Sequence, residues 1–187
     1  MKLQSTIMSS LNPDKRHIIL IGFRGVGKSV IASLLKDKLN YPLFDSDNEI
    51  VKDYGKPIPK IFEEDGENCF RSLEEKIIKQ ICLIQHPVIL STGGGAILSP
   101  KNRLTLKENG FVILLSASEE TIFNRIKDDK NRPPLTDKGF REEISYILNA
   151  RQEFYQETKD IEINTTHLSP DEIVNSIVSF LKNMTQM

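Results

Sequence analysis

The chain has 187 residues with a formal net charge of −1, and 39% of its residues are hydrophobic and 27% are charged. One compact domain is expected at this length, and the composition excludes fibrous and intrinsically disordered classes. The near-neutral charge provides no overall basic field for nucleic-acid phosphates, so nucleic acid is not an expected partner.

The N-terminal segment, residues 1–16, alternates polar and apolar types without the apolar core of a secretory signal, and we expect it to form a mobile tail. Residues 17–183 are then expected to form the single domain. No apolar run reaches the length of a membrane span, so no membrane partner is expected. Two cysteines, Cys69 and Cys82, are too few for a disulfide framework and favour a cytoplasmic location.

The first predicted elements are a strand and a helix separated by a glycine-rich turn. His17–Ile21 is a short apolar run that ends at Gly22, which is typical of a strand buried on both faces. From Lys28 to Leu39 the apolar residues recur at helical spacing, which predicts an amphipathic helix.

Further short strands alternate with helices along the rest of the chain. The predicted strands are Leu43–Asp45, Val88–Ser91, Phe111–Leu115 and Ile161–Ile163. Ser99–Pro100 and Ser169–Glu172 carry helix-start signals. Because crossovers between parallel strands are right-handed, this alternation predicts an α/β fold, a three-layer α/β/α sandwich with a central five-stranded parallel sheet. Its ligands should bind at the carboxyl ends of the strands.

Two stretches depart from this alternation. Residues 48–85 contain helical segments broken by glycines and prolines, which predicts a small substrate-binding lobe over about 46–80. Residues 128–140 are rich in charged and turn-forming types around Pro133–Pro134, which predicts an exposed lid over about 127–141.

The turn Gly22–Ser29 fits the pattern G-x-x-x-x-G-K-[ST] and lies between a buried strand and a helix, as a phosphate loop requires. Its backbone N–H groups and the helix N-terminus would bind phosphate oxygens. Lys28 would reach the β- and γ-phosphates, and the Ser29 hydroxyl would be a ligand of Mg²⁺. The Asp-x-x-Gly and Asn-Lys-x-Asp motifs of a GTPase do not occur in the sequence, which argues against a GTPase and leaves other nucleotide-binding classes open.

A second group of residues could bind another substrate. Asp45 ends the second strand and Asp47 comes two residues later, which places both at the same edge as the phosphate loop. Arg71 and Glu74 are three positions apart, so the carboxylate can orient the guanidinium as an anion clamp. The segment Thr92–Gly95 follows the third strand and allows close approach of a polar ligand. Taken alone, each pattern also fits a solvated turn or surface pair.

Taken together, these residues resemble the shikimate kinase family. The resemblance extends over about residues 17–181, and its most specific part runs from Gly55 to Glu74. It is completed by Asp45–Asp47, Thr92–Gly95, Arg132–Leu135 and Ala150–Tyr155. The resemblance implies transfer of the ATP γ-phosphoryl group to the 3-hydroxyl of shikimate, with Mg²⁺, in aromatic amino acid biosynthesis. It also implies a monomer.

The resemblance assigns roles to individual residues. Lys28, Asp47 and Arg132 would be catalytic, with Asp47 chiefly orienting the acceptor hydroxyl and Arg132 meeting the transferring phosphate from the lid. Ser29 and Asp45 would hold Mg²⁺. The expected ATP-binding residues are Gly25, Val26, Gly27, Lys28, Ser29, Val30, Arg125 and Arg132. The expected shikimate-binding residues are Asp47, Arg71, Gly93, Gly94, Gly95 and Arg151, with Phe62 and Phe70 as walls.

Some residues depart from the family pattern. Val30 and Ala32 stand where Thr and Gly are common, which predicts altered packing rather than lost activity, and Arg24 adds a positive charge that we expect to be solvated. Two alternatives stay open: a kinase for another small acceptor, such as gluconate or a nucleoside monophosphate, and a nucleotide-binding regulatory domain without turnover. Arg71, Glu74 and Arg151 favour a carboxylated polyol.

Overall fold

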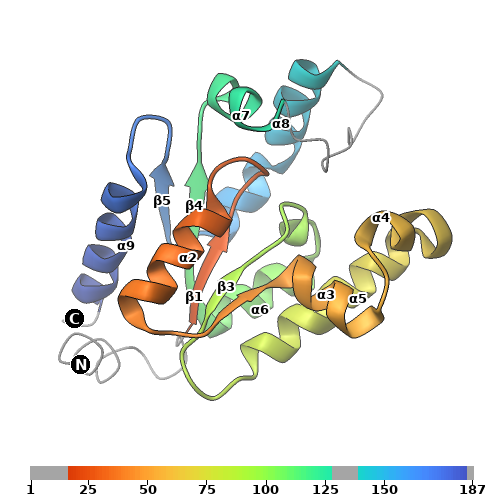
Figure 1. Ribbon diagram of the computed structural model, residues 1–187, viewed down its shortest axis with the longest axis horizontal. Helices are drawn as coiled ribbons and strands as arrows, with labels where there is room; N and C mark the ends of the chain where they lie inside the picture. Colours follow the sequence, from red (N-terminus) through yellow and green to blue (C-terminus); the bar gives the residue numbers. More distant parts are fainter. Residues whose placement is uncertain (1–16, 128–138, 185–187) are drawn as a thin grey trace.

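The computed structural model describes residues 17–127 and 139–184 of the chain. Five parallel strands form one sheet in the order β2-β3-β1-β4-β5, which confirms the predicted α/β class (Figure 1). The strands are β1 (His17–Ile21), β2 (Leu43–Asp45), β3 (Ile89–Ser91), β4 (Gly110–Ser116) and β5 (Ile161–Asn164).

Helices and helical turns alternate with these strands along the chain. They are α2 (Lys28–Leu39), α3 (Ser46–Tyr54), α4 (Ile58–Lys60), the π-helical turn η1 (Ile61–Asp65), α5 (Gly66–Cys82), the 3-10 turn η2 (Ala96–Leu98), α6 (Pro100–Asn109), α7 (Glu119–Ile126), α8 (Phe140–Thr158) and α9 (Pro170–Met184). Among the residues so described, no helix is both long enough and apolar enough to span a membrane.

The central strand β1 is buried along its whole length, and its side chains divide between the two faces of the sheet. Ile18 and Leu20 belong to the apolar cluster beneath α2 and α9, whereas Ile19 and Ile21 belong to the cluster beneath α5 and α6. Successive side chains of a strand point to opposite faces, so a continuous apolar run gives a sheet covered on both sides. This produces the three predicted layers (Figure 1).

Hydrogen bonds at two helix starts explain where these helices begin. The Ser99 hydroxyl accepts from the N–H of Asn102 at 3.3 Å, so α6 begins at Pro100. Ser169 and Glu172 form a reciprocal capping box: the Ser169 hydroxyl accepts from the N–H of Glu172 at 3.3 Å, and the Glu172 carboxylate accepts from the N–H of Ser169 at 2.8 Å. Both helix-start predictions are confirmed.

The segment between β2 and β3 forms α3, α4, η1 and α5, on the right in Figure 1. It occupies the range predicted for a substrate-binding lobe. The predicted tail, residues 1–16, and residues 128–138 of the predicted lid lie outside the described residues. Phe140, which was expected to be in the lid, is the first residue of α8.

Candidate active site

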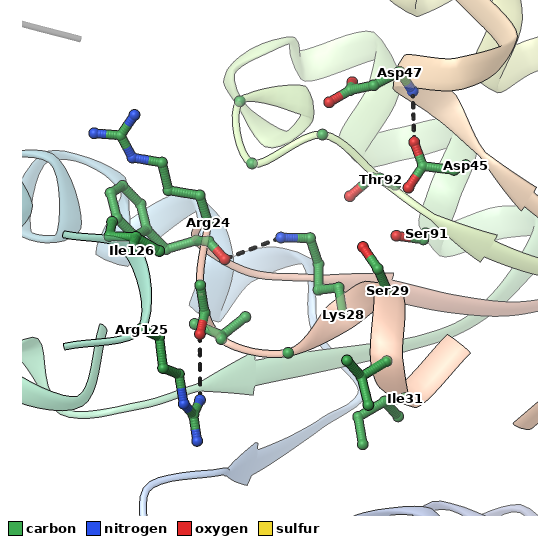
Figure 2. A pocket seen from close by; sticks show the side chains of 18 of the residues that line it. Arg24, Lys28, Ser29, Ile31, Asp45, Asp47, Ser91, Thr92, Arg125 and Ile126 are labelled. Atoms are coloured by element: carbon green, nitrogen blue, oxygen red, sulfur yellow. Dashed lines mark hydrogen bonds between the residues drawn. The ribbon is translucent and has the colours of Figure 1, made fainter. Parts of the chain in front are cut away.

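The phosphate loop connects β1 to α2, as the motif predicts. Gly22 has φ 139°, and a Cβ built there would lie 2.2 Å from the Leu115 carbonyl oxygen, so only glycine fits. The Lys28 Nζ donates to the carbonyl oxygens of Gly22 at 2.7 Å and Phe23 at 3.0 Å. Figure 2 marks one of these bonds with a dashed line. The ammonium therefore lies across the loop, where it can meet phosphate oxygens.

One cavity of about 740 Å³ is lined both by the phosphate loop and by Arg71 and Arg151. Each predicted site residue within the described part of the chain lines this cavity. These residues are Gly25, Val26, Gly27, Lys28, Ser29, Val30, Asp45, Asp47, Arg71, Gly93, Gly94, Gly95, Arg125 and Arg151. Arg132 lies outside the described residues.

Arg71, on α5, is held by two carboxylates. Its Nε and Nη2 donate to Glu67 at 3.1 Å each, and its Nη1 donates to Glu74 at 2.9 Å. A guanidinium carries five N–H groups, so these three bonds leave one on each terminal nitrogen. Two parallel N–H groups match the two oxygens of a ligand carboxylate. The cavity wall beside Arg71 is formed by Phe70 and Phe62, whose ring centroids lie 4.8 Å apart.

A carboxylate oxygen of Asp47 and one of Glu74 lie buried beside Gly93. A Cβ built on Gly93 would lie 2.5 Å from Asp47 Oδ1 and 3.2 Å from Glu74 Oε1. Both oxygens are buried, and neither accepts a hydrogen bond within the described part of the chain. Buried acceptors require donors, so this is where a ligand with hydroxyl groups can be bound.

The environment of the two carboxylates shifts their pKa values. Burial, and then the negative charge of Asp45, raises the pKa of Asp47. Burial raises the pKa of Glu74 to about 7, although the pairing with Arg71 acts in the opposite direction. Low dielectric disfavours the charged form of a carboxyl group, which explains both directions.

Hydrogen bonds join the loop Gly93–Gly95 to side chains of α8. Arg151 Nη1 donates to the Gly94 carbonyl oxygen at 3.0 Å, and the Tyr155 hydroxyl donates to the same oxygen at 2.9 Å. A Cβ on Gly95 would lie 2.8 Å from Arg71 Nη1, so the glycine admits the guanidinium. Gly93 and Gly95 thus make room for charged side chains from α3 and α5.

The residues expected to hold Mg²⁺ lie beside Lys28. Ser29 is in the first turn of α2, and Asp45 ends β2. The Asp45 Oδ1 accepts from the N–H of Asp47 at 3.1 Å, as Figure 2 marks, and from that of Asn48 at 3.3 Å. This bonding fixes the Asp45 carboxylate and leaves Oδ2 for a water ligand of a cation. A hydroxyl and a carboxylate beside a phosphate loop fit Mg²⁺, which takes oxygen ligands and keeps several waters.

Arg125 of α7 connects the phosphate loop to the segment after β5. Its Nη1 donates to the Thr165 hydroxyl at 3.0 Å and to the Gly25 carbonyl oxygen at 3.3 Å, and its Nη2 donates to the Thr165 carbonyl oxygen at 3.0 Å. Thr165 in turn donates to the Val26 carbonyl oxygen at 3.1 Å. This places the guanidinium beside the loop at the rim of the cavity.

The expectation that Arg24 is solvated is wrong. Its guanidinium pairs with Glu143 of α8, whose side chain is 0% exposed, and it lies 5.8 Å from the Phe23 ring and 5.7 Å from the Phe140 ring. Burial of the carboxylate makes the pairing favourable, because an unpaired buried charge is costly. In the sequence Glu143 is part of no motif and is separated from Arg24 by 119 positions, so no local pattern predicts this pair.

Other contributing residues also went unassigned. Glu67 shares Arg71 with Glu74, Tyr155 shares the Gly94 carbonyl with Arg151, and Thr165 holds Arg125. The spacing of four residues between Glu67 and Arg71 could have shown the first of these contacts. The others join segments that are distant in the chain, and no local pattern indicates them.

The fold and the cavity define a class of protein: a P-loop kinase of the α/β type. The family model described as "Shikimate kinase" matches residues 24–182, so the chain belongs to the shikimate kinase family.

Relatives support this assignment. A shikimate kinase from Caldicellulosiruptor bescii is 42% identical over 164 residues, covering 88% of this chain and 94% of the relative. One from Enterococcus faecalis is 40% identical, covering 88% of this chain and 98% of the relative. The solved shikimate kinase from Acinetobacter baumannii in complex with shikimate has a TM-score of 0.84 at 31% identity, covering 91% of this chain and 95% of that one.

Proposed function

We propose that this chain transfers the γ-phosphoryl group of ATP to the 3-hydroxyl of shikimate, giving shikimate 3-phosphate and ADP in aromatic amino acid biosynthesis. The observation that carries this proposal is the shared cavity, which is lined both by a phosphate loop and by Arg71 and Arg151. A carboxylated acceptor bound to these arginines would have its hydroxyl groups near Asp47. The phosphates of ATP would lie near Lys28. Positioning of this kind is the main catalytic contribution in phosphoryl transfer.

At the nucleotide end, the backbone N–H groups of Gly25–Val30 would bind the phosphates, and Lys28 would exchange its carbonyl contacts for β- and γ-phosphate oxygens. Arg125 would lie against the adenine base. Ser29 would hold Mg²⁺ directly and Asp45 through water. When bound, the cation offsets negative charge on the transferring phosphoryl group.

At the acceptor end, the two remaining N–H groups of Arg71 and the guanidinium of Arg151 would bind the carboxylate of shikimate. The Oδ1 of Asp47, which accepts no hydrogen bond from the described residues, would accept one from a ring hydroxyl. The backbone of Gly93–Gly95 would line the pocket, since the absence of side chains permits close approach.

Transfer would proceed by attack of the acceptor hydroxyl oxygen on the γ-phosphorus. The bond from that phosphorus to the bridging oxygen of ADP breaks as the new bond forms, and the hydroxyl proton passes to Asp47. The raised pKa of Asp47 makes it a better proton acceptor than an exposed aspartate, although its main role is to orient the hydroxyl. Arg132 would meet the phosphoryl group during transfer. We further propose that the protein is a monomer and is located in the cytoplasm.

The test is ADP release from ATP and Mg²⁺ with shikimate, gluconate and nucleoside monophosphates as separate acceptors. Turnover with shikimate is expected. Turnover only with gluconate or a nucleotide would identify a different acceptor. ATP binding without turnover on any acceptor would indicate a regulatory nucleotide-binding domain.

A further inference from the structure

Helix α8 contacts two loops through different side chains: the phosphate loop and the loop Gly93–Gly95, called the acceptor loop below. Glu143, in its first turn, pairs with Arg24 of the phosphate loop. Arg151 lies eight residues further on, which is about 12 Å along a helix, and donates to the Gly94 carbonyl oxygen. Tyr155, one turn later, donates to the same oxygen. One helix therefore links the residues that bind the two substrates.

The pairing of Arg24 with Glu143 has the properties of a specific contact. The Glu143 side chain is 0% exposed and that of Arg24 is 15% exposed, so both charges are largely removed from water. The Arg24 guanidinium also lies near an aromatic ring on each partner, Phe23 of the loop and Phe140 of α8. Buried charges are costly unless paired, so a shift of α8 relative to the loop would be penalised.

The two loops also touch each other at Gly94. A Cβ built there would lie 3.5 Å from both the Arg24 backbone nitrogen and the Gly22 carbonyl oxygen, so the acceptor loop packs against the phosphate loop. Arg24, Gly94 and α8 therefore form a closed set of contacts. Displacement of the first turn of α8 would be transmitted along the helix to Arg151, because a helix moves as a rigid element.

We infer that Arg24 and Glu143 are positioning residues, which hold α8 so that Arg151 presents the acceptor in line with the nucleotide bound at the phosphate loop. This inference rests on the proposed role of Arg151. It assigns to Arg24, a residue of the phosphate loop, an effect on the acceptor rather than on ATP. A displacement of about 1 Å in a reacting group can lower a rate by about a hundredfold, so a loss of tenfold or more is expected.

The experiment compares Arg24→Met, Glu143→Gln and the double variant with the wild type. We measure kcat and KM for shikimate and ATP, together with the thermal midpoint. Each variant should lose about tenfold or more in kcat/KM for shikimate, with KM for ATP within about twofold of wild type. The double variant should lose no more than either single variant, because both remove the same contact. Arg24→Lys, which keeps the charge, should recover part of the activity.

Glu142→Gln is the matched control, because Glu142 is exposed in the same helical turn and its substitution removes the same charge. It should behave as wild type. If a single variant does not fold because one buried charge has lost this contact, the double variant carries the test, since it removes both charges.

Several results would overturn the inference. A raised KM for ATP in Arg24→Met with normal Glu143→Gln would show that Arg24 acts on the nucleotide. Losses that multiply in the double variant would show that the two residues act separately. A lower thermal midpoint with unchanged kinetics would show a purely structural pair. Arg151→Ala is measured in parallel: a wild-type shikimate KM there would refute the proposed acceptor site itself.

Discussion

Glu74 should make shikimate binding depend on pH. Its side chain is 1% exposed and its pKa lies at about 7, so near neutrality it is about half ionised in the free protein. Arg71 lies between this carboxylate and the proposed position of the acceptor carboxylate. Binding the acceptor would bring a second negative charge toward Glu74 and favour its protonated form.

The size of this effect follows from the geometry around Arg71. A carboxylate on the far side of the guanidinium would lie roughly 6 Å from Glu74, where two like charges repel by about 3 kcal/mol at an effective dielectric constant near 20. This corresponds to an increase of about two units in the pKa of Glu74 on binding. Because the complex holds the proton more tightly, affinity falls as pH rises through the pKa of the free protein. The shikimate Kd should then rise about tenfold from pH 6 to pH 8.

The assay is isothermal titration calorimetry with shikimate in the absence of nucleotide, which avoids titration of the phosphates. Near pH 8, buffers of different ionisation enthalpy should reveal uptake of nearly one proton per shikimate bound. Glu74→Gln, which resembles the protonated form, should have a flat pH profile. Glu75→Gln is the control, because Glu75 accepts a hydrogen bond from the Ser99 hydroxyl and not from Arg71. This substitution should leave the pH dependence of the shikimate Kd unchanged. A constant wild-type Kd from pH 6 to pH 8, or an unchanged profile in Glu74→Gln, would refute the reasoning.

The same pKa has a consequence for stability. The pKa of Glu74 is raised from 4.5 to about 7 on folding, so its contribution is most favourable below pH 4.5 and is lost as pH rises through 7. This loss amounts to about 3 kcal/mol between pH 4 and pH 8. Urea unfolding at both pH values should show a smaller pH-dependent loss in Glu74→Gln than in wild type. An identical loss in both proteins would contradict the prediction.

Three further substitutions test the site. Arg71→Ala should lower kcat/KM for shikimate by the equivalent of about 2 to 5 kcal/mol, the cost of removing one partner of a desolvated charge pair, and wild-type kinetics would exclude its role. Arg132→Ala should lower kcat more than shikimate affinity in steady-state assays; an unchanged kcat would count against a contact with the transferring phosphate. Gly93→Ala should weaken shikimate binding but not ADP binding, measured by calorimetry, because its Cβ would meet Asp47 Oδ1 at 2.5 Å; Gly139→Ala, whose Cβ would have no atom of the described residues within 4 Å, is the control. Equal weakening of both ligands would refute a local effect.

Much of the fold could be predicted because it is specified by local patterns. The run His17–Ile21 is buried on both faces, and the alternation of strands with helices allows only a parallel sheet covered on two sides. The order β2-β3-β1-β4-β5 was not predicted, because strand order depends on which crossovers pack together. The beginning of α8 at Phe140 was also missed, because charged and turn-forming residues precede it.

The site also has a part that could be predicted from local sequence patterns and a part that could not. The sequence by itself determined the phosphate loop, because Gly22–Ser29 is contiguous and its strand–turn–helix context creates the anion site locally. The spacing of three residues likewise predicted the contact between Arg71 and Glu74. Only the tertiary structure decided which distant side chains surround these groups. Glu74 and Asp47 acquire raised pKa values because packing buries them on either side of Gly93. Arg24 acquires its partner 119 positions away because α8 folds back over the loop, and long-range burial of this kind has no local pattern from which to predict it.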